Sequence, residues 1–554
     1  MTSIRESLRA AVAAARDRAI SSGALPQPES ALLPPVGIER PSRAEHGDFA
    51  SNAAMQLAPV LRRSPLAIAE ALRAELGTPD GVLATSVAPP GFLNIQLDPA
   101  WLAGQVAAIR QAGATFGMAR AAEPHRINVE FVSANPTGPL TVGNARGAFV
   151  GDLLSRVLEA VGHDVVREYY FNDFNAQVRN LGLSLQARHE GREPTEDGYH
   201  GEYVTQMVRE VPDELWAAAA AEGADPGEVL GRWASERVRA GIEASLAELG
   251  VRFDVWTSEG SLHDEGWVPR ALDQLRASGD LYEADGATWF RSSAYGDEKD
   301  RVVIRSNGQP TYFASDIGYL AEKFSRGFDE LVYLWGEDHH GTVARNRAAA
   351  QALGFQADHV HWLLMAWVRF VRDGQEIGMS KRAGEFISLD ELLAEIGSDA
   401  ARWYFGSRAP QTGIDFDIEL AKKESAENPV YYVQYAHARA SSILRNGQAA
   451  SVEADDSHAA ALLHHPAEQA LLRRVLDLPD VVADAAARRE THEITRFLLE
   501  SAQLFSAFYR DCRVLSEDPD ERRLSEARLA LTDATRQVLA NGLGLLGIRA
   551  PTSM

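Results

Sequence analysis

Residues 126–162 read RINVEFVSANPTGPLTVGNARGAFVGDLLSRVLEAVG. Residues 126–133 predict a strand, 134–144 a turn rich in Gly and Pro, and 145–162 a helix. A strand, a glycine-containing turn and a helix in this order are typical of the opening unit of a doubly wound nucleotide-binding sheet. Gly143 allows a ligand to approach the backbone, and the N–H groups at the start of the helix favour a phosphate. On its own the signal is weak, because many such turns are only turns.

The sequence beyond this unit predicts a split parallel sheet. An acidic helical block separates the early strands from the late ones, so we expect one insertion at about 175–300. The strand-like segments are 164–170, 301–306, 331–335 and 359–361, the last leading into a mixed segment that ends near Arg372.

The two ends of the chain differ from this centre. A helix is predicted over 3–20, a second helix is capped by Ser64 and opened by Pro65, and two short strands follow. From Pro429 onward the pattern is almost wholly helical. We therefore expect a small α+β domain at 1–118, a Rossmann-type domain at 119–412 and an all-α domain at 413–554.

Composition narrows the class of protein. A chain of 554 residues is too long for one core, and its single cysteine, Cys512, excludes a disulfide framework and a Cys-based zinc site. No apolar run approaches the ~20 residues that span a bilayer. The N-terminal segment has no signal-peptide apolar core, so a cytoplasmic protein without membrane contact is expected.

The net charge of −23 argues against nucleic acid as a partner only when it is taken as a total. Residues 181–300 alone carry a net charge of −14, whereas residues 1–118 are neutral and 411–554 carry −6. The acidic centre is most simply a solvated surface. The two ends therefore remain free to present local basic faces.

Three further segments carry chemistry. Lys381 and Arg382, in the loop GMSKR at 378–382, suit a polyphosphate, although an exposed basic turn is the alternative. In WGEDHHG at 335–341, Asp338 could accept hydrogen bonds from ribose, and adjacent histidines rarely bind one metal ion. Tyr312 and Asp316 share a helical face and could hold a cation, or could simply form a core hydrogen bond.

Together these segments resemble a class I aminoacyl-tRNA synthetase, and within that class the arginyl-tRNA synthetase family. Thr141-Val-Gly-Asn144 resembles the HIGH motif, and 378–382 resembles the KMSKS loop. The phrases that carry the closer likeness span nearly the whole chain. They are HGDFASNAAMQLA (46–58), VEFVSANPTGPL (129–140), FDVWTSEG (253–260), TYFASDIGY (311–319), WGEDHHG (335–341), NPVYYVQYAHAR (428–439) and NGLGLLGIRAP (541–551).

The resemblance implies an enzyme that activates L-arginine with ATP and transfers it to the 3′ end of tRNA(Arg). A guanidinium has five donors and no acceptor, so carboxylate and phenol acceptors suit it. Mg²⁺ is expected to enter with ATP, no structural metal is expected, and the chain is expected to be a monomer. The implied arginine-binding residues are Glu130, Ser133, Asn135, Tyr312, Asp316 and His340. The implied ATP-binding residues are Pro136, Val142, Gly143, Asn144, Gly336, Asp338, His339, Met379, Ser380 and Lys381.

The catalytic roles implied by the resemblance fall on Thr141, Asn144, Lys381 and Arg382. Two positions depart from the usual motifs. The first histidine of the HIGH motif is Thr141 here and the second is Asn144, so neither can become cationic. The first lysine of the KMSKS loop is Gly378. Lys381 is therefore the loop cation expected to matter most.

The resemblance also implies an N-terminal domain that contacts the tRNA elbow and a C-terminal domain that reads the anticodon. Asn52, Tyr435, Arg439 and Arg496 are the candidate tRNA contacts. A turn asparagine, core aromatics and solvated arginines are the alternatives. The acidic insertion is expected to face away from the RNA. Two other functions stay open: a catalytically silent tRNA-binding protein, and a small-molecule adenylating ligase or nucleotidyltransferase.

Overall fold

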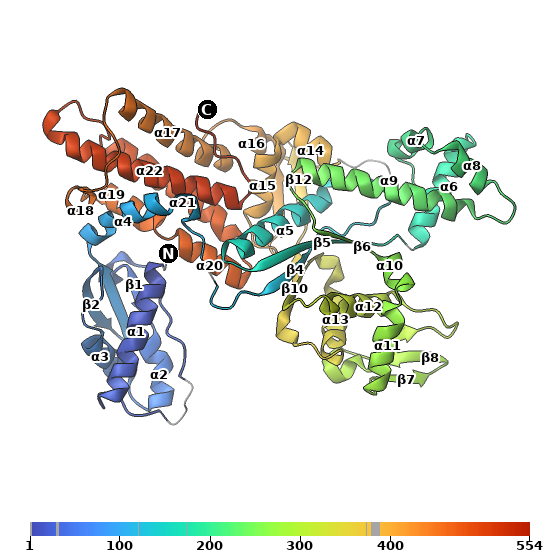
Figure 1. Cartoon of the computed structure of the whole chain (residues 1–554), viewed down its shortest axis with the longest axis horizontal. Helices are drawn as coiled ribbons and strands as arrows, with labels where there is room; N and C mark the ends of the chain where they lie inside the picture. The colour runs from blue at the N-terminus through green and yellow to red at the C-terminus, as the bar shows by residue number, and fades with distance from the viewer. Residues whose placement is uncertain (1–2, 29–32, 120, 174, 373, 378–387) are drawn as a thin grey trace.

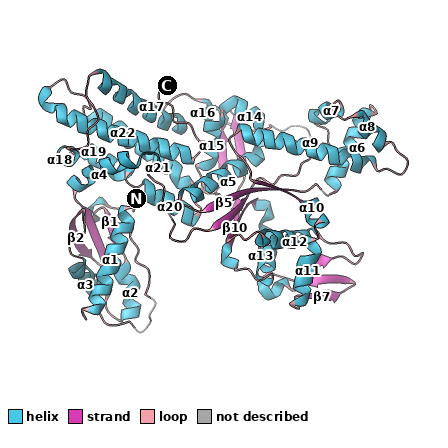
Figure 2. Ribbon diagram, in the orientation of Figure 1, coloured by secondary structure: helices cyan, strands magenta, loops and turns pink. Residues whose placement is uncertain are grey.

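The computed structural model describes residues 3–554 apart from 29–32, 120, 174, 373 and 378–387. Figure 1 shows an N-terminal body, a central sheet with two outlying lobes, and a bundle of helices, and Figure 2 separates their helices from their strands. Among the described residues, no helix combines the length and the apolar composition needed to cross a bilayer.

The N-terminal body is a three-stranded antiparallel sheet, in the order β1-β3-β2, covered by helices. The predicted first helix is confirmed, and Ser64 caps α3 as expected, its hydroxyl accepting from the N–H of Ala67. The elements are α1 (Ile4–Ser21), β1 (Phe49–Ser51), α2 (Ala53–Leu61), α3 (Pro65–Leu76), β2 (Val82–Ala88) and β3 (Phe92–Leu97).

The central domain contains a five-stranded parallel sheet in the order β11-β10-β4-β5-β6. The chain builds one half outward from β4 and then returns to the other side of β4, so the strand order reverses between β4 and β10. This is the doubly wound topology that the sequence predicted. The strands are β4 (Arg126–Glu130), β5 (Asp164–Phe171), β6 (Val255–Ser258), β10 (Glu330–Gly336) and β11 (Val360–Met365), and the flanking helices include α5 (Val142–Ala160) and α13 (His340–Ala352).

The predicted insertion at 175–300 is not one piece, because the sheet strand β6 lies inside it. The first piece is an all-helical arm, and the second is a lobe of helices with its own antiparallel sheet, β7-β8-β9. The prediction that 301–306 returns to the main sheet was therefore wrong. The arm holds α6 (Ala176–His189), α7 (Glu202–Val208), α8 (Asp213–Ala219) and α9 (Pro226–Glu248). The lobe holds α10 (Glu259–Asp264), α11 (Trp267–Ala277), β7 (Leu281–Ala284), β8 (Ala287–Phe290), β9 (Arg301–Ile304) and α12 (Tyr312–Ser325).

A small sheet, in the order β13-β12-β14, connects the main sheet to the C-terminal helices. β12 continues almost directly from β11 and pairs with β14 in parallel. The elements of this connection are β12 (Val368–Arg372), β13 (Gln375–Glu376), α14 (Leu389–Ile396), α15 (Ser398–Gly406), β14 (Ile414–Asp417) and α16 (Ile418–Lys422).

The C-terminal part is helical, as predicted. Helix α4 (Pro99–Ala112), which follows the N-terminal sheet, packs against α18, α19 and α22 of this bundle. The bundle consists of α17 (Pro429–Ala449), α18 (Ala459–Leu462), α19 (Pro466–Val475), α20 (Leu478–Arg488), α21 (His492–Asp511) and α22 (Arg522–Leu545).

Ion pairs fasten the N-terminal body and α4 to this bundle rather than to the central sheet. Arg5 pairs with Asp480 and Asp484 of α20, and Arg473 of α19 pairs with Asp48. Gln469 of α19 also donates to the carbonyl of Pro99. The two ends of the chain therefore form one packed unit.

Candidate active site

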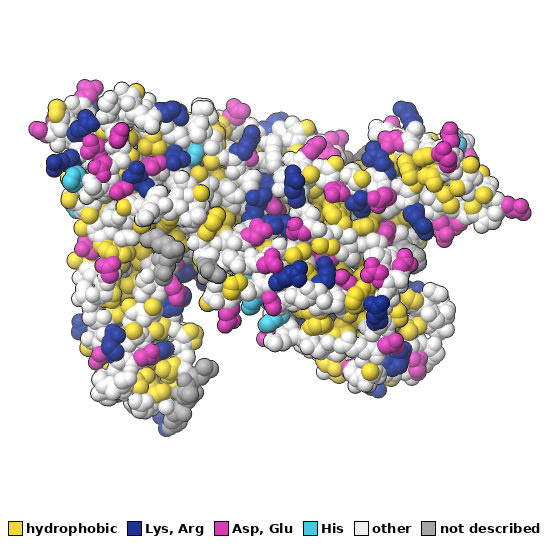
Figure 3. All heavy atoms as spheres, in the orientation of Figure 1, with side chains coloured by type: hydrophobic (Ala, Val, Ile, Leu, Met, Phe, Trp, Pro, Cys, Tyr) yellow, Lys and Arg dark blue, Asp and Glu magenta, His cyan; other side chains and the backbone are white. Residues whose placement is uncertain are grey.

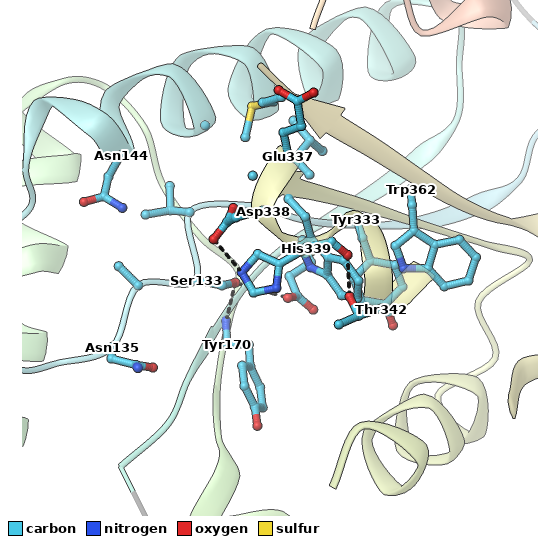
Figure 4. Close-up of a pocket in the computed structure, with 18 of the residues that line it drawn as sticks. Ser133, Asn135, Asn144, Tyr170, Tyr333, Glu337, Asp338, His339, Thr342 and Trp362 are labelled. Carbon is cyan, nitrogen blue, oxygen red and sulfur yellow. Dashed lines mark hydrogen bonds and ion pairs between the residues drawn. The ribbon is translucent and has the colours of Figure 1, made fainter. Parts of the chain in front are cut away.

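A cavity of about 840 Å³ opens where the strand order reverses, at the carboxyl ends of β4 and β10. Parallel sheets of this topology bind ligands at this place, and the volume lies in the range of small-molecule sites. In the view of Figure 4, Asn135 and Asn144 lie on one side of the pocket and Trp362 on the other, with Ser133, Asp338 and His339 between them.

The backbone directly after β4 is strained. Val132 and Ser133 both have positive φ values, 67° and 42°, which β-branched and polar residues rarely adopt. The turn is held because the Tyr169 hydroxyl donates to the carbonyl of Ala134 and accepts from its N–H. It directs the Ser133 hydroxyl toward Glu130 (3.2 Å) and lets that hydroxyl accept from the N–H of Tyr170.

Glu130, at the end of β4, is already paired. Its carboxylate lies 2.6 Å from the ammonium group of Lys323 on α12, and both side chains are buried. The rings of Tyr319 and Tyr333 lie 4.5 and 4.2 Å from the same ammonium. Glu130 therefore belongs to a buried network and offers the cavity only part of its acceptor capacity.

Among the described residues, three other carboxylates of the cavity wall have no cationic side chain within ion-pair distance: Glu259, Asp316 and the exposed Glu337. Asp316 lies one turn into α12, where burial raises the pKa of its carboxyl to about 7 and the nearby charge of Arg345 opposes this rise. Glu259, at the start of α10, accepts from the Tyr170 hydroxyl at 2.8 Å, and burial raises its pKa as well. Glu259 is buried and Asp316 half-buried, so both carboxylates gain from a bound cation.

The N-terminus of α5 forms the opposite wall. Asn144 accepts, through Oδ1, from both the N–H and the hydroxyl of Thr141, each at 3.1 Å. This arrangement directs the amide NH₂ of Asn144 away from Thr141, and Asn144 lines the cavity. Thr141 itself is buried and acts as the helix cap. Gly143 is exposed, and a side chain there would meet only Thr141 at 3.5 Å.

The third wall follows β10. A Cβ at Gly336 would lie 2.3 Å from a carboxylate oxygen of Asp338, so a side chain there would displace that carboxylate. Asp338 and His339 are exposed to the cavity, and His339 Nε2 lies 3.7 Å from a carboxylate oxygen of Asp338. The exposed carboxylate of Asp338, next to Gly336 at the end of β10, suits the hydroxyl groups of a ribose.

Comparison with known proteins agrees with this geometry. Sequence profiles match residues 2–97 to the arginyl tRNA synthetase N terminal domain, 105–404 to the class I (R) tRNA synthetase catalytic domain and 433–554 to the DALR anticodon binding domain. A curated protein of Moorella thermoacetica named Arginine--tRNA ligase is 44% identical over 569 aligned positions, covering 100% of both chains. The chain belongs to the arginyl-tRNA synthetase family.

Other relatives extend this result. A protein of Heliobacterium modesticaldum with the same name is 44% identical over 534 positions, covering 94% of each chain. The solved structure of the Thermus thermophilus arginyl-tRNA synthetase superposes with a TM-score of 0.79 at 25% identity, covering 100% of both chains.

The structure brings together most of the residues that the family resemblance implied. Helix α12 places Asp316 in the wall. Tyr312, the first residue of the same helix, also lines the cavity, and its side chain is 64% exposed. The predicted residues that line the cavity are Glu130, Ser133, Asn135, Tyr312 and Asp316 for arginine, and Gly143, Asn144, Gly336, Asp338 and His339 for ATP.

Other predicted residues lie elsewhere. His340 is exposed at the start of α13 and does not line the cavity that the described residues form. Pro136 and Val142 are buried behind the wall, where they shape the loop and the first turn of α5. Met379, Ser380, Lys381 and Arg382 lie outside the described residues.

The sequence missed several residues of the wall. Glu259 and Tyr170 were overlooked because their partnership joins two distant segments, and only the pairing of β5 with β6 brings them together. Their one signal was the quoted phrase FDVWTSEG, which ends on Glu259 and Gly260. The remaining wall residues with polar groups include Asn172, Tyr319, Tyr333, Arg345 and Asn346.

The candidate tRNA contacts lie on other parts of the molecule. Tyr435 is 39% exposed on α17, and the Arg439 guanidinium lies 4.6 Å from its ring and 5.2 Å from that of Tyr509. Arg496 is paired with Glu493 and Glu500 on its own helix. The exposed rings of Tyr435 and Tyr509 and the guanidinium of Arg439 are of the kind that stacks on unpaired bases.

Asn52 has a different setting. A Cβ at Gly37 would lie 2.9 Å from its Oδ1, and that atom is buried with no hydrogen-bond partner among the described residues. The side chain is therefore packed against the loop before β1, at the N-terminus of α2.

Proposed function

We propose that the chain is an arginine–tRNA ligase, which forms arginyl-adenylate from arginine and ATP and transfers the arginyl group to tRNA(Arg). The observation that carries the proposal is one cavity that combines two carboxylates outside ion-pair distance of any described cationic side chain, Asp316 and Glu259, with the N-terminus of α5 and the exposed carboxylate of Asp338. This combination suits a cationic amino acid beside a nucleotide.

The guanidinium of arginine would lie between Asp316 and Glu259, with the phenol of Tyr312 covering the mouth. The guanidinium offers five donors in a fixed planar fork to the two carboxylates, whereas the ammonium of lysine offers three donors from a single point. Citrulline, which is neutral, would leave both buried carboxylates uncompensated. The α-ammonium would meet Ser133, Asn135 and the free acceptor capacity of Glu130.

The ATP would lie along α5 and β10. Gly143 and Asn144 supply donors to the phosphates, and Asp338 with Gly336 would hold the ribose. The carboxylate of arginine attacks the α-phosphate and pyrophosphate leaves. The terminal ribose hydroxyl of tRNA then attacks the carbonyl of the adenylate and AMP leaves. Both steps depend on positioning and on neutralising phosphate charge, with Lys381 and Arg382 as the proposed loop cations.

Mg²⁺ is proposed to enter with ATP, since magnesium is usually bound by substrate phosphates and one or two carboxylates. Among the described residues, no group of three His, Cys, Asp or Glu side chains is placed to hold a metal ion. A monomer in the cytoplasm and domain boundaries near 118 and 412 are further parts of the proposal.

The tRNA is proposed to lie along the N-terminal body and the helical bundle, with Asn52, Tyr435, Arg439 and Arg496 as candidate contacts. On the face in Figure 3, acidic and basic side chains alternate over the bundle, which favours local contacts over a broad basic surface. The acidic arm α6–α9 lies at the opposite end of the molecule from the N-terminal body in Figure 1, as expected if it faces away from the RNA.

The decisive experiment is arginine-dependent exchange of pyrophosphate into ATP, run with and without tRNA(Arg), followed by charging of that tRNA. Exchange and charging are expected for arginine and not for lysine or citrulline. A protein that binds tRNA(Arg) but gives no exchange in its presence would instead be the silent binding protein. Pyrophosphate exchange supported by at least one amino acid, without charging of tRNA(Arg), would favour a small-molecule ligase.

A further inference from the structure

Arg146 is a buried arginine in the wall of the cavity. It lies on α5, one turn beyond Gly143, and only 2% of its surface is exposed. Residues three or four apart share a helical face, and Gly143, Arg146 and Gly147 all line the cavity. The guanidinium is therefore close to the part of α5 that faces a nucleotide.

The guanidinium is fixed by backbone carbonyls. One nitrogen donates to the carbonyl of Ala366 at 2.7 Å, and the other donates to those of Ala409 and Thr412 at 2.9 Å each. These acceptors lie in the turn between β11 and β12 and in the turn before β14. The Nε of Arg146 is buried and has no partner among the described residues.

No carboxylate of the described residues lies within ion-pair distance of Arg146. Of the acidic side chains of the same cavity, Glu130 pairs with Lys323, Glu259 accepts from Tyr170, and Asp338 lies beside His339. The other two, Asp316 and Glu337, are likewise outside ion-pair distance of Arg146. Burial without such a partner lowers the pKa of Arg146 to about 10, which leaves it charged at neutral pH. A buried cation without a counter-ion is costly.

Arg402 shows what a purely structural arginine looks like in this chain. It is 3% exposed and also fastens separate segments, donating to the carbonyls of Leu546 and Leu249. Unlike Arg146, it pairs with a buried carboxylate, that of Asp152, at 2.7 Å. The arginine that lines the cavity is the one of the two without a carboxylate.

We propose that Arg146 is a positioning residue for the nucleotide, and that the polyphosphate of bound ATP supplies the counter-charge that the protein withholds from it. The hydrogen bond to Ala366 holds the turn at 366–368, which lines the cavity, against α5, and the other two hold the turn before β14 there. The arrangement also provides a fixed positive charge in a site where Thr141 and Asn144 cannot be cationic. This proposal concerns how ATP is bound and would survive a different amino-acid substrate.

The test compares ATP, a charged nucleotide, with adenosine, the neutral nucleoside. Binding of ATP and of adenosine to the full chain is measured by calorimetry for the unmodified protein and for Arg146→Gln. We expect ATP affinity to fall on the order of tenfold, with adenosine affinity changing less than about twofold. An equal loss for both ligands, or no loss for ATP, would overturn the proposal. Arg402→Gln is the matched control and should lower thermal stability without changing the ratio of the two affinities.

A second variant keeps the test decisive if Arg146→Gln does not fold. Arg146→Lys retains the charge, but a buried lysine loses its proton at lower pH than arginine does. Its ratio of ATP to adenosine affinity should therefore fall between about pH 7 and 9 relative to the unmodified protein. A ratio that follows the unmodified protein across this range would contradict the role of the charge.

Discussion

The ammonium nitrogen of Lys323 lies 2.6 Å from a carboxylate oxygen of Glu130 at the closed end of the cavity. Removing one member of such a buried pair leaves an uncompensated charge, so Lys323→Met should lower the free energy of unfolding by about 3–5 kcal/mol. Denaturant unfolding monitored by fluorescence measures this. The double variant with Glu130→Gln should recover part of the loss, and Lys423→Met, in an exposed pair with Glu427, should change nothing measurable.

Asp316 should control the affinity for arginine. Asp316→Ala is expected to raise the KM for arginine at least 30-fold, in line with about 2–5 kcal/mol for truncating one partner of a buried charge pair, while the thermal melt stays that of a folded protein. An unchanged KM would refute the pocket assignment.

The pH dependence of arginine use should report the same carboxyl. Because the pKa of Asp316 is raised to about 7, it is partly protonated in the empty enzyme at neutral pH. Only the ionised form attracts a guanidinium, so kcat/KM for arginine should rise between pH 6 and 8 and arginine binding should release protons. In the absence of ligand the raised pKa has the opposite effect on folding, since stability from this group is lost as pH rises through 7. Asp316→Asn should abolish the rise in kcat/KM.

Glu259 should act as the second acceptor for the guanidinium. Glu259→Gln keeps the side-chain shape and the contact with Tyr170 but removes the charge, so the KM for arginine should rise on the order of tenfold. Pyrophosphate exchange at saturating ATP measures it. Glu265→Gln is the control, because Glu265 is exposed, is not among the residues that line the cavity, and accepts with its carboxylate from Trp267.

Glu330 should couple the central sheet to the helical bundle. It accepts from Arg489 at 2.6 Å and contacts His125 and His361. These partners hold its pKa well below the usual range although burial opposes them. Its stabilisation is therefore present above about pH 4.3 and is lost as pH falls further. Arg489→Met should destabilise the protein by about 3 kcal/mol and should speed hydrogen exchange in α20 but not in β11.

Tyr435 and Arg439 should contribute to tRNA binding. Arg439 lies over two exposed rings, so Tyr435→Ala should raise the KM for tRNA about tenfold, consistent with 1–3 kcal/mol for one stacked base. The KM for arginine measured in the presence of saturating tRNA should not change. Arg496→Ala, which removes a cation already paired with two glutamates, should have the smaller effect. A larger effect of Arg496→Ala than of Tyr435→Ala on the KM for tRNA would place the RNA along α21 instead.

The fold could be predicted from the sequence wherever it depends on local patterns. Residues 126–162 indicated the parallel sheet because strand, turn and helix signals follow each other within one unit. β6 escaped notice because four residues between two helical blocks carry little periodic signal, and β9 was assigned to the wrong sheet because a strand does not encode its partner.

The site was predictable only in part for a similar reason. Asp316 and Tyr312 are four residues apart on one helix, so spacing alone put them on one face. The pairing of Glu130 with Lys323 joins residues 193 positions apart. The strained turn at Val132 has no glycine or asparagine at its two positive-φ positions that would indicate them from the sequence. His340 was implied only by the family resemblance; it is exposed at the start of α13 and is not among the described residues that line the cavity.

The attachment of the first domain to the last has a consequence for how the protein is made. Gln469 and Pro99, which bond each other, are separated by 370 residues. At about 5–20 residues per second of synthesis, the ribosome needs roughly 20–75 s to make the stretch between them. During this interval the surface by which the N-terminal body and α4 later pack against the bundle stays exposed to solvent.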